Sequence, residues 1–413
     1  MRKIMASINV DSDSIKLLVG EFNGSHLNIL SASKVSSSTS FDDKNSNIGV
    51  IDAIKNAVKD TSETLGIEIK KVILGIDERN LKLVKSEGKV DIKSEDKVIT
   101  GEDIDKVLSN ACDSKIPEKY ALVSMIPAQF TLDEDKKVRE PLGRESNTLS
   151  VKAILALSPK DYVKSLLEII EESGLKVVDV VINTLGDYAT FETNSTRKDI
   201  GAIINLGYDI STISIFNKGI LTNTKCYNAG YKSVIKDIGY IYKIDTQSAT
   251  GLYRDLALAS TRLANVNDYR NVINEEGKEV RVNQYEISEI ASSRIEEILN
   301  LAKKQINILT KKEISYIIVT GGLTELKDFS IILEKVIGKS AYLGDVKNIG
   351  ARDNNYASTL GILKYYKDRL DLRGKAFSMF TSSEIEEMND KGKRVSDNKE
   401  SIFGKVFGYF FES

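Results

Sequence analysis

Apolar and polar residues alternate in two stretches that lie about half a chain apart, and each stretch predicts a β-hairpin. In residues 4–30, the runs IMASINV, IKLLVGEF and LNIL are separated by DSDS and NGSH, and Asn23-Gly24 is a strong hairpin signal. Residues 199–221 contain an apolar strand, a turn at 207–209 and an alternating strand. Two similar hairpins suggest a duplicated fold. A β-hairpin in the core of any α/β domain would give the same pattern.

The same patterns predict the remaining elements. Thr100 can cap a helix, with Asp103 as its reciprocal acid, and Gly174 is placed to end another. All four prolines fall between residues 117 and 159, which marks an inserted module. Residues 382–400 are too polar to fold alone, and the section 86–97 is also polar. The predicted helices are 49–65, 100–111, 160–173, 231–240, 248–263, 288–309, 324–336 and 358–366, and the predicted strands are 70–76, 120–132, 149–157, 176–182, 280–282 and 314–320.

Composition narrows the function classes. The 413 residues carry a net charge of −2, which gives no reason to expect nucleic acid as a partner. The two cysteines, Cys112 and Cys226, lie far apart, so neither a disulfide framework nor a zinc site is indicated and a reducing compartment fits. A single histidine leaves little for histidine-dependent hydrolysis. No secretory signal or membrane-spanning run is expected.

Several motifs together resemble one family. They are LLVGE at 17–21, TGEDIDKVL at 100–108, IPAQF at 126–130 and VTGG at 319–322. Their order and spacing over nearly the whole chain resemble the bacterial FtsA family of cell-division proteins, within the actin, Hsp70 and sugar-kinase superfamily. The resemblance implies an α/β fold of duplicated actin-like, ribonuclease H-like type, with an FtsA-type inserted subdomain.

The resemblance also implies a division of the chain. It places a candidate docking surface for the C-terminal tail of FtsZ in a small subdomain, and Arg294 falls where family members carry an arginine in that surface. An ordinary exposed helix arginine is an equally good interpretation. The expected parts are a first lobe (1–78 and 161–198, with a return helix near 356–371), the inserted subdomain (79–160), a second lobe core (199–221 and 310–355), the small subdomain (222–309), a flexible linker (372–400) and a membrane-targeting helix (401–413).

By the same resemblance, the hairpin turns and the Gly321-Gly322 loop bind ATP, with or without Mg²⁺. Asn9 and Asn205 stand where the family has aspartates, and an amide has no charge to attract a hard cation and is no general base. A one-residue shift would place Asp11 or Asp13 there instead. We therefore expect weak or structural ATP binding, negligible hydrolysis, and no catalytic or metal-binding residue. The expected nucleotide-binding residues are Asn9, Asp11, Ser12, Asp13, Ser14, Lys16, Asn205, Gly207, Tyr208, Asp209, Ser211, Gly321, Gly322 and Leu323.

The last residues, SIFGKVFGYFFES, predict an amphipathic helix. It is too short to cross a bilayer but suits the membrane interface. Packing on the protein's own core is the alternative. The expected membrane-contacting residues are Ile402, Phe403, Val406, Phe407, Phe410 and Phe411.

The favoured hypothesis is therefore a cytoplasmic actin-like protein at the division site. It would form filaments, bind FtsZ and other division proteins, and attach peripherally to the inner face of the cell membrane. Two alternatives remain: an actin-like scaffold of another membrane system, of the pilus-assembly type, and an active ATPase or small-molecule kinase of the same fold.

Overall fold

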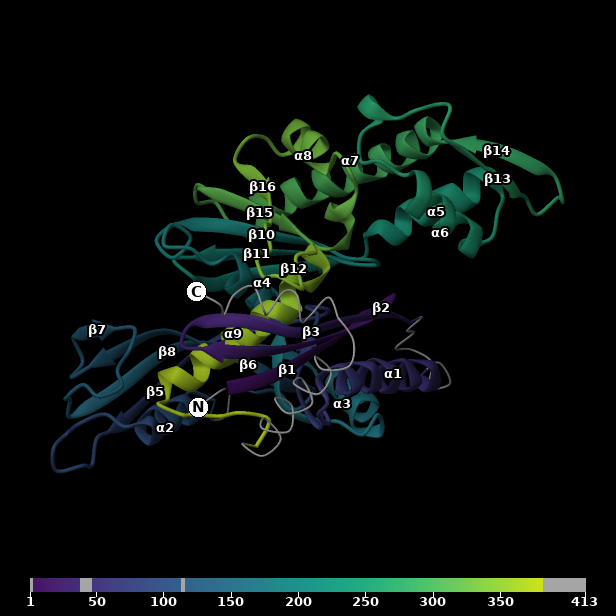
Figure 1. Cartoon of the computed structure of the whole chain (residues 1–413). Helices are drawn as coiled ribbons and strands as arrows, with labels where there is room; N and C mark the ends of the chain where they lie inside the picture. Colours follow the sequence, from purple (N-terminus) through teal and green to yellow (C-terminus); the bar gives the residue numbers. More distant parts are fainter. Residues whose placement is uncertain (1–2, 38–46, 113–115, 382–413) are drawn as a thin grey trace, which may run out of the picture.

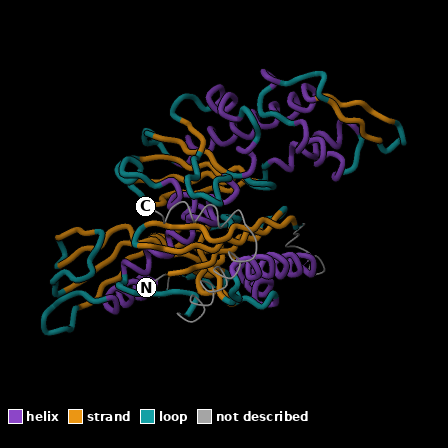
Figure 2. Tube along the Cα trace, viewed as in Figure 1, coloured by secondary structure: helices purple, strands orange, loops and turns teal. Residues whose placement is uncertain are grey.

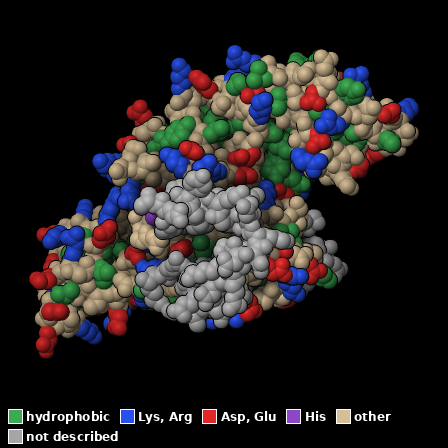
Figure 3. All heavy atoms as spheres, viewed as in Figure 1, with side chains coloured by type: hydrophobic (Ala, Val, Ile, Leu, Met, Phe, Trp, Pro, Cys, Tyr) green, Lys and Arg blue, Asp and Glu red, His purple; other side chains and the backbone are tan. Residues whose placement is uncertain are grey.

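The computed structural model describes residues 3–37, 47–112 and 116–381. The chain forms two lobes, which Figure 1 shows one above the other, and residues of both lobes line a cavity between them. Figure 2 shows that each lobe combines a sheet with helices. On the face in Figure 3, Lys and Arg side chains are interspersed with Asp and Glu side chains, in keeping with the net charge of −2.

The first lobe is built on a five-stranded sheet of order β3-β2-β1-β4-β9. The hairpin strands β1 to β3 pair antiparallel, whereas β4 and β9 continue the sheet parallel to β1. This is the strand, turn and strand pattern that the alternating residues predict. The strands are β1 (Lys3–Val10), β2 (Ser14–Asn23), β3 (His26–Ser36), β4 (Lys71–Ile76) and β9 (Lys176–Ile182).

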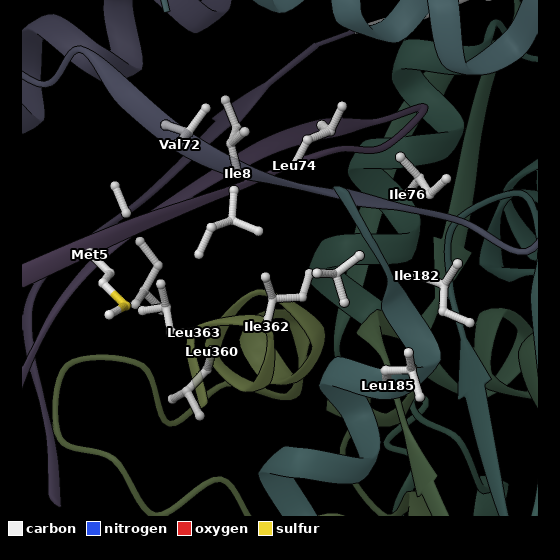
Figure 4. Close-up of a cluster of buried hydrophobic side chains, with 14 of the residues drawn as sticks. Met5, Ile8, Val72, Leu74, Ile76, Ile182, Leu185, Leu360, Ile362 and Leu363 are labelled. Carbon is white, nitrogen blue, oxygen red and sulfur yellow. The ribbon is translucent and has the colours of Figure 1, made fainter. Parts of the chain in front are cut away.

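Helices cover this sheet because its strands are apolar on both faces. α1 (Asn47–Leu65) contacts β2 and β3, and α3 (Lys160–Glu172) lies beside α1. α4 (Asn183–Phe191) and α9 (Ala357–Leu372) pack on each other, and α9 also packs on β1 and β4. Figure 4 shows the resulting core, where side chains of the two helices meet those of the strands: Met5, Ile8, Val72, Leu74, Ile76, Ile182, Leu185, Leu360, Ile362 and Leu363.

The second lobe repeats the first in topology. Its sheet has the order β12-β11-β10-β15-β16, again three antiparallel strands followed by two parallel ones. This repeat confirms the predicted fold class of a duplicated actin-like fold. The elements are β10 (Ile200–Leu206), β11 (Ser211–Asn217), β12 (Ile220–Tyr227), α7 (Gln284–Leu309), β15 (Tyr316–Thr320), η3 (Gly322–Glu325), α8 (Phe329–Val336), β16 (Ala341–Leu343) and the short η4 (Asn354–Tyr356).

A small subdomain extends from the second lobe, at the upper right of Figure 1. It is formed by α5 (Tyr231–Tyr242), α6 (Thr246–Leu256), η2 (Thr261–Leu263) and the hairpin of β13 (Tyr269–Ile273) and β14 (Glu279–Asn283). The predicted helix 248–263 therefore ends early, at Leu256. The predicted helix 324–336 is likewise divided, since α8 begins only at Phe329.

An inserted module follows β4 and has its own core. Its sheet has the order β5-β8-β6-β7, and α2 packs on β5 and β8. The predicted cap is confirmed: the Thr100 backbone N–H donates to the Asp103 carboxylate over 3.0 Å, and the Asp103 N–H donates back to Thr100 Oγ1 over 3.3 Å. The elements are β5 (Lys82–Asp91), α2 (Gly101–Cys112), β6 (Tyr120–Leu132), β7 (Lys136–Val138) and β8 (Thr148–Pro159).

The packed chain extends past the expected start of the linker at residue 372. The Met379 N–H donates to the Ile4 carbonyl over 3.0 Å, and the Met379 and Phe380 side chains are buried in the first lobe. Residues 373–381 therefore belong to the folded body, and residues 382–413 lie outside the described residues. Within the described ranges, no helix is both long and apolar enough to cross a bilayer.

Candidate functional site

The site lies in the cleft between the lobes, where the ends of several strands meet. β1, β4 and β9 run parallel, so the loops that follow them converge at one edge of the first sheet. The loops after β10 and β15 face them from the second lobe. Between these loops is a cavity of about 60 Å³. Small-molecule sites usually have volumes of roughly 300–1,000 Å³, so this cavity is small for a site of that kind.

Most of the residues predicted for nucleotide binding meet here. Ser14 and Ser211 are buried behind the turns, and Leu323 is fully buried in the core of the second lobe, so these three do not face the cavity. The predicted residues that line it are Asn9, Asp11, Ser12, Asp13, Lys16, Asn205, Gly207, Tyr208, Asp209, Gly321 and Gly322.

Asn9 lies at the end of β1 and is 2% exposed. Its Nδ2 donates to Asn183 Oδ1, the first residue of α4, over 2.8 Å. The pair depends on Gly75 in β4, because a Cβ at that position would lie 2.1 Å from Asn9 Oδ1 and 2.7 Å from Asn183 Oδ1. Asn9 Oδ1 is buried and has no hydrogen-bond partner among the described residues.

Asn205 occupies the matching position in the second lobe. Its Nδ2 donates to Asp187 Oδ2 over 2.8 Å, and Ser358 Oγ donates to the other oxygen of that carboxylate over 2.7 Å. Burial raises the pKa of Asp187 to about 6, and the hydrogen bonds from Asn205 and Ser358 oppose this rise. The Asn205 amide thus joins the second lobe to a buried acid of the first.

The turn after β1 is also committed to internal contacts. Lys16 Nζ pairs with Asp11 Oδ2 over 2.5 Å, and the Tyr231 hydroxyl donates to Asp13. Tyr231 begins α5, and its ring lies edge-on to Tyr208 at 4.9 Å between centroids. The Asp13 to Tyr231 hydrogen bond therefore links the first lobe to the small subdomain.

Three consecutive polar residues after β4, residues 77–79, are the main part of the site that the sequence did not predict. Glu78 accepts hydrogen bonds from the Thr184 N–H (2.7 Å) and from Thr212 Oγ1 (3.1 Å). Burial raises the pKa of Glu78 to about 8. A signal was available, because a polar run directly after a buried parallel strand lies at the same sheet edge as the turn after β1.

Arg79 crosses the cleft. Its Nη2 lies 2.9 Å from Asp209 Oδ2 in the second lobe, and its Nε lies 3.1 Å from Asp77 Oδ2 in its own loop. Ser12 Oγ donates to the same Asp209 oxygen over 2.8 Å. The Asp209 carboxylate is thus neutralised by a guanidinium of the opposite lobe.

The third loop follows β15. Gly321 has φ +97°, a conformation that favours glycine, and a Cβ there would lie 2.5 Å from the Leu206 carbonyl oxygen. A Cβ on Gly322 would lie 2.7 Å from Asn355 Oδ1. Gly321 is therefore required by its backbone conformation and by close packing on β10, whether or not a ligand binds beside it, whereas the close contact at Gly322 involves the end of the Asn355 side chain.

These residues do not fit Mg²⁺ at the positions that the resemblance implies. A hard divalent cation takes oxygen ligands, of which carboxylates supply the charge, but Asn9 and Asn205 are neutral. The neighbouring carboxylates of Asp11, Asp187 and Asp209 already have a cationic or hydrogen-bonding partner. In the part of the chain that the structure describes, no group of three His, Cys, Asp or Glu side chains could hold a metal ion.

Arg294 lies far from this cleft, on α7. Its Nε and Nη2 bind both oxygens of Asp237 on α5, at 2.7 and 2.9 Å, and its Nη1 contacts Glu297 at 2.6 Å. The guanidinium therefore links α7 to α5 by hydrogen bonds. A role in binding a partner stays a prediction, and the predicted membrane-contacting residues lie outside the described residues.

Two sheets of matching strand order that face each other across such a cleft define an actin-like protein. Solved structures agree in fold: the PilM-PilN type IV pilus biogenesis complex matches with a TM-score of 0.58 at 12% identity, over 89% of this chain and 98% of that one. MreB5 of Spiroplasma citri bound to ADP matches with a TM-score of 0.51 at 10% identity, over 90% and 98%.

Within this class, the chain is similar to the FtsA cell-division proteins. Residues 79–156 match the SHS2 domain inserted in FtsA. Cell division protein FtsA of Enterococcus hirae is 26% identical over 368 residues, which are 87% of this chain and 82% of that protein. FtsA of Bacillus subtilis is 24% identical over 380 residues, 90% and 86% of the two chains. The chain is thus an actin-like protein that is similar to cell-division proteins over most of its length.

Proposed function

We propose that this protein forms filaments and tethers FtsZ polymers to the cytoplasmic face of the cell membrane at the division site. It attaches peripherally through residues 401–413, binds ATP weakly or as a structural ligand, and hydrolyses it negligibly. The observation that carries the proposal is the FtsA-type SHS2 match at residues 79–156, inserted after β4 of an actin-like body.

The small subdomain supports FtsZ binding, because it exposes apolar side chains. Tyr240 is 87% exposed and Ile241 is 55% exposed, both at the end of α5, and Ile273 on β13 is 69% exposed. Apolar exposure of this kind is frequent at protein-binding surfaces. The inserted module is the candidate contact for neighbouring copies and for other division proteins.

The proposed attachment to the membrane rests on the sequence of residues 401–413. Phenylalanines recur there with the spacing of one helical face, and a helix of this kind inserts its apolar face at the headgroup boundary. A single lysine adds little attraction to anionic lipid. One tail should therefore bind reversibly, and a polymer that carries many tails should bind firmly.

The cleft supports weak hydrolysis. Asn9 and Asn205 lack the charge to hold a cation, and Glu78, with a pKa of about 8, is mostly protonated at neutral pH and cannot act as a general base. We expect turnover well below about 1 per second, the low end of typical enzymes. A Mg²⁺-dependent turnover at or above that rate would favour the alternative of an active ATPase.

Co-sedimentation with liposomes tests the tethering function. FtsZ polymers should pellet with vesicles when the full chain is present and stay in the supernatant when residues 401–413 are deleted. Phe403→Ser with Phe407→Ser should act like the deletion, whereas Ser401→Ala serves as the matched control. Persistent membrane binding of the deletion variant would contradict the role of the tail.

An FtsZ C-terminal peptide separates this proposal from a pilus-type scaffold. The immobilised peptide should retain the full chain, and a scrambled peptide of the same composition should not. Equal retention by both peptides, or by neither, would contradict the FtsZ-tethering function. Tyr240→Ser with Ile241→Ser then tests whether the exposed end of α5 contributes to binding.

A further inference from the structure

The guanidinium of Arg79 lies between the turn after β1 and the turn after β10. Arg79 Nη2 lies 3.1 and 2.9 Å from the two oxygens of Asp209, and 3.4 Å from Ser12 Oγ. Arg79 comes from the loop after β4, Ser12 from the turn after β1 and Asp209 from the turn after β10. A positive charge therefore occupies the place where the two turns approach each other.

Lys16 adds a second cation to the same cavity. Lys16 is 9% exposed, and its Nζ pairs with Asp11 over 2.5 Å. The two positions that would supply metal-binding carboxylates, Asn9 and Asn205, carry neutral amides. Within the described residues, the cations that could balance the charge of a polyphosphate in this cavity are thus the side chains of Arg79 and Lys16.

The chemistry of the Arg79 contacts matches a phosphate. A guanidinium binds carboxylate and phosphate oxygens alike, and here its nitrogen Nη2 contacts both oxygens of Asp209. The Asp209 carboxylate and Arg79 both line the cavity, and this carboxylate occupies the guanidinium nitrogen Nη2. A phosphate that binds Arg79 through Nη2 therefore takes the place of the Asp209 carboxylate.

We propose that this cleft binds the polyphosphate of a nucleotide without a divalent cation, with Arg79 exchanging Asp209 for phosphate. The inference deepens the ATP binding proposed above and rests on it. Asp209 holds Arg79 in position when the cleft is empty and competes with the ligand when it binds. Lys16 provides the second countercharge from the first lobe.

Fluorescence titration of the full chain with a ribose-labelled ATP analogue tests the metal dependence. The dissociation constant in EDTA should agree with that in Mg²⁺ within about threefold. Binding that is more than tenfold weaker in EDTA would overturn this inference while leaving ATP binding intact. Absence of binding in both buffers would overturn the ATP part of the proposed function as well.

Three variants test the residue assignment, all measured in EDTA. Arg79→Ala should bind at least tenfold more weakly, whereas Arg262→Ala, an exposed arginine outside the cleft, should bind like the wild type. Asp209→Asn should bind several-fold more tightly, because it removes both a competitor and a repulsive charge. This gain does not depend on how well Arg79→Ala folds. Unchanged affinity in a folded Arg79→Ala protein, or weaker binding by Asp209→Asn, would overturn the proposal.

Discussion

Glu78 is a residue whose buried environment opposes its ordinary charge. It is 4% exposed, and burial raises its pKa to about 8 from an unfolded value of 4.5. The fold therefore favours the protonated form, so this contribution to stability is fully present below about pH 4.5 and is lost as pH rises through about 8. Glu78→Gln keeps the shape of the side chain and cannot ionise, so the variant does not lose this stability as pH rises. We expect it to raise the free energy of unfolding on the order of 2 kcal/mol at pH 8 and much less at pH 5.

Urea unfolding followed by circular dichroism at pH 5 and pH 8 measures this difference. Glu171→Gln, at an exposed position of α3, is the matched control and should change stability little at either pH. Equal effects of Glu78→Gln at the two pH values would show that Glu78 does not titrate between them in the folded protein.

Single residues of the site could be predicted only where a turn pattern marks them. The turns that contain Asp11 and Asp209 are visible between alternating strands, and the structure places both at the cavity. The partners of these residues could not be predicted, because Arg79 meets Asp209 across 130 residues of sequence. Leu323 was placed in the site by its neighbours Gly321 and Gly322, but an apolar side chain next to a buried core turns inward.

At the scale of elements, the crossing of α4 and α9 depends on two glycines. A Cβ on Gly361 would lie 1.7 Å from the Gly186 carbonyl oxygen and 2.5 Å from Thr190 Oγ1, and a Cβ on Gly186 would lie 2.3 Å from the Ser358 carbonyl oxygen. The two carbonyl contacts involve backbone that cannot rotate away. Gly361→Ala should therefore separate the helices and lower the free energy of unfolding by about 3 kcal/mol.

Gly251→Ala in α6 is the matched control, because nothing lies within 4 Å of its added Cβ. It should stabilise the protein slightly, by roughly 0.5–1 kcal/mol, since alanine favours a helix over glycine. Thermal unfolding of the two variants checks the direction of both predicted changes in stability. A Gly361→Ala variant as stable as the wild type would contradict the close helix crossing.

The same crossing explains why α4 was not predicted. Asn183–Phe191 reads NTLGDYATF, with a glycine in its centre that weakens the helical pattern. Its helical form depends on packing against α9, which begins more than 160 residues further along the chain. β5 was not predicted for a related reason: its residues Lys82–Asp91 are largely polar and exposed, and its pairing with β8 makes it a strand.

For the whole molecule, the duplicated architecture could be predicted because each half carries its own hairpin signal. The way in which the two lobes close on each other could not be predicted from the sequence. It depends on polar contacts between the lobes, among them Ser12 with Asp209, Asn205 with Asp187 and Glu78 with Thr212. None of these pairs follows from local periodicity, because each joins loops that the fold alone brings together.

Attachment to a membrane is also a property of the assembled molecule. A short amphipathic segment binds lipid weakly, whereas linked segments bind with a high effective concentration. If the protein forms filaments that carry residues 401–413 on every subunit, vesicle binding should rise more steeply with protein concentration than a single-site curve. Sedimentation at increasing protein concentration and fixed lipid measures the slope, with the chain truncated after residue 400 as the control. A simple hyperbola at all concentrations would mean that each copy binds alone, and the proposed firm tether would then need a contact with lipid beyond these residues.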